Sequence, residues 1–254
     1  MSYTVDAVSQ AMELLFLVAE HPGLGVTELA KRSGNTKARA FRLLGTLEEK
    51  GLVRRQEPFA TYYLGAKSLF LGAAGQSQVT VASIAATLLP EIGRQCNESV
   101  LVRVREGTET VCVALWESPH AVRVHSQLGH RRELYYGASG KLLLAHAPEE
   151  VQEAVLNAKR EKFTPNTITG RAQLEKELKK IREQGYSVSL AEKAADTVAV
   201  AAPIRDARGT VVASVSMSAP ASRVVPNDLQ KYIELIREGA ARFSHEFGYV
   251  EQHE

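Results

Sequence analysis

The chain of 254 residues is 44% hydrophobic and 24% charged, with a formal net charge of +2 at pH 7. These proportions are typical of globular proteins and exclude wholesale disorder, and the length favours two domains over one. The sequence has two cysteines without a CxxC pair, no signal-peptide pattern at its start, and no run of about eighteen apolar residues. We therefore expect a cytoplasmic protein with no membrane partner.

The first 65 residues have the pattern of a helix-turn-helix. Apolar residues at spacings of three and four predict a first helix, with Asp6 as its N-cap. A second helix, capped by Thr27, ends at the turn 33–35, and a third helix runs from about Thr36 to Lys50. Two helices joined by a tight turn that contains glycine, the second of them basic, are typical of a unit that enters the DNA major groove.

Basic residues gather over this stretch. Between Lys31 and Arg55 there are eight bases and two acids, a local net charge of +6 that favours contact with nucleic acid. Arg39 offers the bidentate donor that suits guanine, whereas Lys31, Arg32 and Lys50 are expected to be solvated charges only. The predicted DNA contacts in the helices are Thr27, Thr36, Lys37, Ala38, Arg39 and Arg42.

A β-hairpin is predicted directly after the third helix. Residues 52–55 and 61–65 bracket the segment 56–60, and the hairpin forms a wing on which Arg54 and Arg55 reach phosphate or the minor groove. Residues 1–65 are thus predicted to form a winged helix-turn-helix DNA-binding domain, followed by a linker helix over 66–78.

From residue 79 onward the pattern changes to that of a mixed domain. Helix-flanked strands with short hairpin connections indicate an α+β fold with an antiparallel sheet. Strands are predicted over 99–105, 110–116, 121–125, 186–190, 198–205 and 210–218. Helices are predicted over 79–96 with a kink or restart at Pro90, over 138–146, from Pro148 as first helical residue, over 171–184, and from Pro226 onward.

Three kinds of chemistry are disfavoured by spacing. The segment 137–141 has its first glycine too close to Gly140-Lys141 for a phosphate-binding loop, although its small residues at a helix start suit a carboxylate or simple close packing. His120, His125 and His130 recur every five residues, which is not the spacing of a metal site. No Gly-x-Ser-x-Gly elbow surrounds a serine, so the sequence predicts no catalytic residue, no metal and no cofactor.

Several motifs, taken in order, resemble the IclR family of bacterial transcriptional regulators. Residues 11–15 and 43–55 resemble the winged helix-turn-helix of that family. The C-terminal motifs are Glu117-Ser118-Pro119-His120, Ala138-Ser139-Gly140-Lys141, Thr164-Pro165-Asn166-Thr167-Ile168-Thr169, Gln184-Gly185-Tyr186, Ala201-Ala202-Pro203-Ile204 and Ser216-Met217-Ser218-Ala219-Pro220. Each motif is weak by itself, but their shared order is specific.

The resemblance implies a GAF-like α/β domain over 79–254 that binds a small-molecule effector and forms a homodimer or homotetramer. Its ligands would be small organic acids or aromatic catabolites. The implied effector contacts are Ala138, Ser139, Gly140, Ser189, Ala199, Ser216 and Ser218. Tyr135 and Tyr136 stand near the place where relatives have a histidine, which favours an aromatic or apolar effector stacked on one of them.

The sequence therefore predicts a DNA-binding transcriptional regulator, not an enzyme, whose binding to a double-stranded operator of a catabolic operon is controlled by an effector. Two alternatives remain at this stage. One is a metabolite-processing enzyme domain fused to a DNA-binding module, and the other is an architectural DNA-binding protein without an effector.

Overall fold

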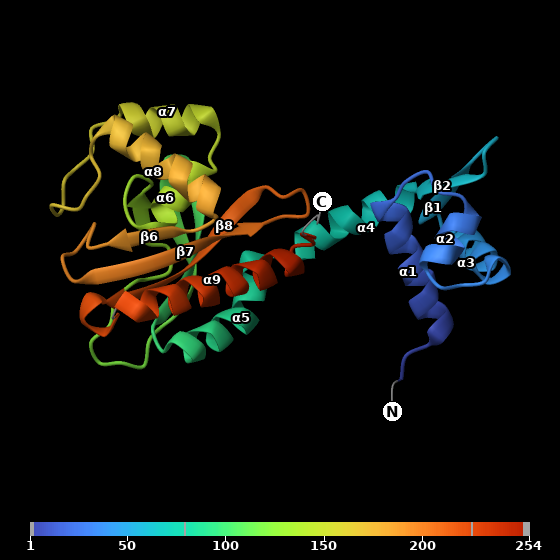
Figure 1. The fold of residues 1–254 in the computed structure, drawn as a ribbon, viewed down its shortest axis with the longest axis horizontal. Coiled ribbons are helices and arrows are strands. Elements are labelled where there is room, and N and C mark those ends of the chain that lie inside the picture. The colour runs from blue at the N-terminus through green and yellow to red at the C-terminus, as the bar shows by residue number, and fades with distance from the viewer. Residues whose placement is uncertain (1–2, 79, 225, 251–254) are drawn as a thin grey trace. The chain divides into compact units, whose positions relative to one another are not determined.

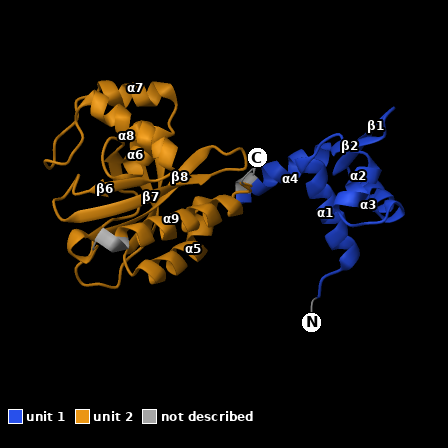
Figure 2. Ribbon diagram, viewed as in Figure 1, with its two compact units in different colours: residues 1–78 blue, residues 79–254 orange. Residues whose placement is uncertain are grey.

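The structure, a computed structural model, describes residues 3–78, 80–224 and 226–250 (Figure 1). The chain divides into two compact units, residues 1–78 and residues 79–254 (Figure 2). The N-terminal unit contains α1 (Asp6–Glu20), α2 (Val26–Arg32), α3 (Lys37–Glu49), β1 (Val53–Gln56), β2 (Thr61–Leu64) and α4 (Ala66–Gln78).

A small apolar core holds the three-helix part of this unit together. Leu14 and Val18 of α1 are fully buried against α2 and α3, whose apolar side chains face inward at helical spacing. The hairpin β1–β2 adds Val53 and Tyr62 to this core, which positions the wing beside α3. The core consists of Leu14, Val18, Leu29, Ala30, Ala40, Leu44, Leu47, Val53 and Tyr62.

The starts of α1 and α2 differ from the prediction by one or two residues. Val5 is the N-cap of α1, and Asp6 lies in the first turn, where its carboxylate pairs with Arg39 rather than capping the helix. Gly25 is the N-cap of α2 because it forms a bridge with Thr61 of β2, so the helix begins before Thr27. Neither Asp6 nor Thr27 is therefore a cap.

The C-terminal unit is a sheet covered by helices on both faces. Within the described residues the sheet has six strands in the order β5-β4-β3-β8-β7-β6, and every neighbouring pair is antiparallel. Its elements are α5 (Val81–Cys96), β3 (Ser99–Glu106), β4 (Glu109–Trp116), β5 (Arg131–Glu133), α6 (Ala138–Ala145), α7 (Glu149–Asn157), α8 (Arg171–Gln184), β6 (Ser187–Leu190), β7 (Thr197–Arg205), β8 (Val211–Pro220), the 3-10 turn Ala221–Arg223 and α9 (Pro226–Glu246).

The two faces of the sheet carry different cores. On one face α5 and α9 pack over buried strand residues such as Val102, Val200 and Met217, and Figure 1 shows these helices together below the sheet. On the other face lie α6, α7 and α8, with a core that includes Leu142, Leu178 and Ala201. Because side chains alternate along a strand, residues next to those of the first core point toward α6.

Three predictions for this unit were wrong in detail. Residues 121–125 form no strand, and Val122 is 71% exposed; the place beside β4 is taken by β5, whose Glu133 pairs with Glu109. Pro148 is the N-cap of α7 rather than its first residue. The helix does not restart at Pro90, because Pro90 lies inside the single helix α5, which starts after a capping box at Thr80 and Ser83.

Candidate nucleic-acid interface and ligand cavity

The N-terminal end of α3 presents donors to solvent. Thr36 is the N-cap, and its Oγ1 accepts a hydrogen bond of 3.3 Å from the backbone N of Arg39. Lys37, Ala38 and Arg42 are exposed along the helix, as is Thr27 on α2. The predicted contacts on α3 thus lie at the helix start, the part that meets base edges in a helix-turn-helix.

Arg39 is not free in this structure. Its guanidinium donates to the carboxylate of Asp6 in the first turn of α1, and the side chains are 38% and 72% exposed respectively. A pair this exposed contributes about 1 kcal/mol or less, so a phosphate or a guanine edge can displace Asp6. Asp6 therefore orients Arg39 without holding it firmly.

Phe41 was missed by the sequence analysis. It is 52% exposed and lies four residues after Lys37, so both side chains share one face of α3. An exposed aromatic ring on this face can contact a thymine methyl group. In the sequence, the signal for this position was that the apolar Phe41 lies between the predicted contacts Arg39 and Arg42.

The two wing arginines differ in their surroundings. Arg54 lies over the ring of Tyr63, 4.9 Å from its centroid, and within the described chain it has no carboxylate partner. Arg55 pairs with Glu57 at 3.2 Å, and its backbone N donates to Glu48. Arg54 is therefore the wing cation more available for phosphate.

A cavity of about 60 Å³ lies between the start of α6 and the sheet of the C-terminal unit. It brings together eight of the nine predicted effector contacts, and Tyr135 is the one it leaves out. The predicted residues in its lining are Tyr136, Ala138, Ser139, Gly140, Ser189, Ala199, Ser216 and Ser218.

Strand register explains why these residues meet. Ala199 of β7 lies between Ser189 of β6 and Ser218 of β8, so the three side chains share one face. On β8, Ser216 is two residues from Ser218 and lies opposite Leu101 of β3. The Ser139 hydroxyl, on α6, donates to Ser216 Oγ at 2.9 Å, and both residues line the cavity.

The first turn of α6 offers backbone donors to this cavity. Lys141 N makes the first intrahelical bond, 3.1 Å to Gly137 O, so the N–H groups of the three preceding residues have no carbonyl partner within the helix. Gly140 allows close packing here, because an added Cβ would lie 3.0 Å from Leu134 O. Such a helix start attracts a carboxylate.

Lys141 points away from the cavity. Its side chain is 1% exposed and its Nζ donates to Glu192 Oε1 at 2.5 Å, to Glu177 Oε1 at 3.1 Å and to Val188 O at 3.0 Å. Glu192 also accepts a bond of 2.9 Å from Gly137 N. This cluster ties the start of α6 to the loop between β6 and β7.

The tyrosines are arranged differently from the stacking platform expected. Tyr135 is 2% exposed, donates to Glu161 O at 2.9 Å, and lies outside the cavity lining; burial raises its pKa. Tyr136 lines the cavity, but the Lys193 ammonium lies 5.2 Å from its ring centroid and 3.1 Å from that of Phe163. The aromatic cluster therefore holds a cation beside the cavity.

Three cations in the lining were not predicted as site residues. Arg103 of β3, Arg132 of β5 and Lys193 of the β6–β7 loop all line the cavity, whereas none of its lining residues is acidic. Arg103 is in phase with Leu101 on a strand, which places both side chains toward α6. Arg132 and Lys193 lie in segments whose positions depend on tertiary packing, so no sequence signal was available for them.

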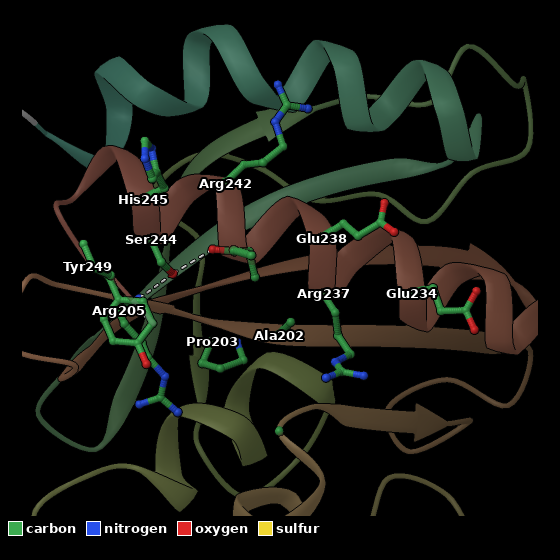
Figure 3. Close-up of a pocket in the computed structure, with 14 residues that line it drawn as sticks. Ala202, Pro203, Arg205, Glu234, Arg237, Glu238, Arg242, Ser244, His245 and Tyr249 are labelled. Carbon is green, nitrogen blue, oxygen red and sulfur yellow. Dashed lines mark hydrogen bonds between the residues drawn. The ribbon is translucent and has the colours of Figure 1, made fainter. Parts of the chain in front are cut away.

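A second hollow, of about 910 Å³, is an open groove between α9 and β7 (Figure 3). Its charged side chains are of both signs, among them Arg205, Arg237, Arg242, Glu234 and Glu238.

Within residues 3–78, 80–224 and 226–250, no three His, Cys, Asp or Glu side chains gather as a metal site requires. In the same residues no helix combines the length and apolar character needed to cross a membrane.

Known proteins resemble this chain over nearly its whole length. Residues 7–57 match the IclR helix-turn-helix domain, and residues 74–245 match the family described as bacterial transcriptional regulator IclR C-terminal. The HTH-type transcriptional regulator KdgR of Escherichia coli (strain K12) is 29% identical over 247 residues, 97% of this chain and 94% of that protein. The HTH-type transcriptional repressor AllR of the same strain is 32% identical over 209 residues, 82% of this chain and 77% of that protein.

A solved structure agrees with these sequence relatives. The crystal structure of the repressor BlcR from Agrobacterium tumefaciens has a TM-score of 0.84 and 27% identity, covering 98% of this chain and all of that one.

Replacing Glu192 with Gln should lower the free energy of unfolding by about 3 kcal/mol, because it leaves the buried Lys141 ammonium with one fewer charged partner. Glu177→Gln is the matched control: its side chain is 21% exposed, so the loss should be about 1 kcal/mol or less. Calorimetric unfolding of the full chain measures both, and equal losses would contradict the role given to Glu192.

Proposed function

This chain belongs to the IclR family of bacterial transcriptional regulators, and on that premise we propose that α3 and the wing read its operator while the cavity beneath α6 holds the effector. The observation that carries this proposal is the convergence of the start of α6 with Ser139 and Ser216 in one cavity.

The N-terminal unit supplies the DNA contacts in this proposal. Lys37, Ala38 and Arg39 at the start of α3 contact base edges in the major groove, and Arg42 further along reaches phosphate. Arg54 and Arg55 on the wing position the unit on the DNA backbone. The charge of the surrounding segment supports this assignment.

The effector in this proposal is a small organic acid. The cavity has a volume of about 60 Å³, which favours a small ligand over a drug-sized one. The start of α6 suits a carboxylate, and Ser139 and Ser216 add hydroxyl groups. Effector and operator then affect each other's affinity by the same factor, as linkage requires.

The same residues do not favour catalysis. An activated serine donates its proton to a base, whereas the Ser139 hydroxyl donates to another hydroxyl, that of Ser216. We propose a binding site without turnover.

We also propose a homodimer. The outer face of α1 exposes Val5, Val8 and Phe16, at 64%, 56% and 58%, and Met12 lies between them at the same helical spacing. An apolar stripe of this kind on a DNA-binding unit suits contact with a second copy. Two copies place their α3 helices about 34–36 Å apart on a palindromic operator.

The first test separates base reading from phosphate contact. Arg39→Ala should lower the preference for operator over random DNA by roughly 1–3 kcal/mol, because a bidentate contact to guanine is lost. Arg54→Ala should weaken binding to both DNAs about equally and reduce the salt slope by about one. Fluorescence anisotropy at several salt concentrations measures these effects. An equal loss on both DNAs for both variants would refute the assignment.

The second test fills the cavity. Ser216→Leu should abolish the response to effector, because the larger side chain occupies the ligand volume, while operator binding without effector stays unchanged. Thermal-shift screening with short-chain and aromatic acids detects ligands, since binding raises stability by RT ln(1 + [L]/Kd). Ser222→Leu, at an exposed position of the same unit, should keep the response. Effector release of operator by the Ser216 variant would rule this cavity out.

The third test concerns the dimer. Phe16→Glu should reduce the advantage of a full palindrome over a single half-site by about tenfold, because a buried charge disrupts the contact between copies. Val122→Glu, at an exposed position in the C-terminal unit, is the control and should leave that advantage intact. An unchanged preference for the full palindrome in the Phe16 variant would remove α1 from the interface.

A further inference from the structure

Arg103 is a buried cation that lacks a full set of partners. Arg103 is 2% exposed. Its Nη1 donates to Thr110 Oγ1 at 3.0 Å and to His130 O at 3.1 Å. Its Nη2 is buried without a hydrogen-bond partner among the described residues, and no carboxylate there pairs with it. Buried guanidinium groups are normally paired and fully bonded, because burying an unpaired charge is costly.

The charge of Arg103 persists at neutral pH. Burial, and then the nearby positive charge of Arg132, lower its pKa to about 10, which leaves the group protonated. The same cations act on His130. Burial is the largest cause that lowers the pKa of His130, and the positive charges of Arg132, Arg103 and Lys193 are among the others. These groups therefore share one positive field.

No protein anion in the cavity lining compensates this field. Arg103, Arg132 and Lys193 all line the cavity, and its lining contains no Asp or Glu. The nearest acid along the chain from Lys193 is Glu192, which is occupied by Lys141 and by the backbone N of Gly137. Like charges close together destabilise each other unless an anion joins them.

The opposite wall of the cavity attracts anions by a separate device. The first turn of α6 lines the cavity and has backbone N–H groups without carbonyl partners in the helix, and Ser139 and Ser216 add hydroxyls. The cavity thus has two anion-binding walls, one made of helix donors and one made of cations.

We propose that the effector is a short-chain dicarboxylate, with one carboxylate at the start of α6 and the other on the guanidinium of Arg103. This inference rests on the proposed function, since it takes the cavity to be the effector site. Arg103 Nη2 supplies the unused donor, and Arg132 and Lys193 neutralise the remaining charge. The cavity of about 60 Å³ lies between these two sets of donors.

Matched acids test the requirement for two charges. Titration calorimetry of the full chain compares succinate with butyrate, and malonate with propionate, so that each pair differs by one carboxylate. The dicarboxylate should bind roughly 10- to 100-fold more tightly, the range expected for hydrogen bonds to a charged group. Equal affinity of the two members of both pairs, or tighter binding of benzoate than of succinate, would overturn the proposal.

Variants locate the second carboxylate. Arg103→Gln should weaken succinate roughly 10- to 100-fold and leave butyrate unchanged, because only the dicarboxylate reaches this residue. Arg105→Gln, on the same strand and outside the cavity lining, should change neither affinity. Equal weakening of both acids by Arg103→Gln would overturn the proposal.

Lys193→Met is a second variant that does not depend on the folding of an altered core, because Lys193 is exposed and lies in a loop. It should weaken the binding of succinate more than that of butyrate, and equal weakening would again overturn the proposal.

Operator release separates the dicarboxylate assignment from the proposed function. If a monocarboxylate releases operator and Arg103→Gln still responds, the dicarboxylate assignment fails while the proposed function stands. If none of the carboxylates binds or releases operator, the effector assignment of the cavity itself fails.

Discussion

The buried contact between Lys141 and Glu192 is the interaction on which the C-terminal site depends. Lys141 belongs to α6, Glu192 belongs to the loop between β6 and β7, and Gly137 N donates to the same carboxylate. One carboxylate thereby fixes both the start of the helix and the loop that carries Lys193. Because a buried ion pair requires accurate geometry, this contact fixes the position of α6 relative to the loop.

The positive charge of the cavity comes from residues other than its serines. Serines and helix donors satisfy a neutral or singly charged ligand equally well, whereas Arg103 and its two cationic neighbours favour added negative charge. The aromatic residues nearby, Tyr136 and Phe163, contact Lys193 and so set the position of a charge. Selectivity in such a site comes from matching buried charge rather than from apolar area.

The N-terminal unit has a weak, exposed contact at the start of α3. Arg39 pairs with Asp6 on the surface, and an exposed pair of this kind contributes about 1 kcal/mol or less. Its internal core is small and mostly apolar, with Leu14, Leu29 and Leu44 completely buried.

Sequence periodicity by itself determined the helix-turn-helix, the wing and most strands, since each depends on neighbouring residues, and the ordered motifs indicated the family by resemblance. It failed where a distant partner decides: residues 121–125 alternate like a strand, yet β5 occupies the sheet edge. Likewise Tyr135, a predicted effector contact, lies outside the cavity lining, which contains the three cations Arg103, Arg132 and Lys193. Only the tertiary structure determines which face of a strand is covered by α6, and hence which charges share one enclosed volume, because that depends on contacts between residues far apart in the chain.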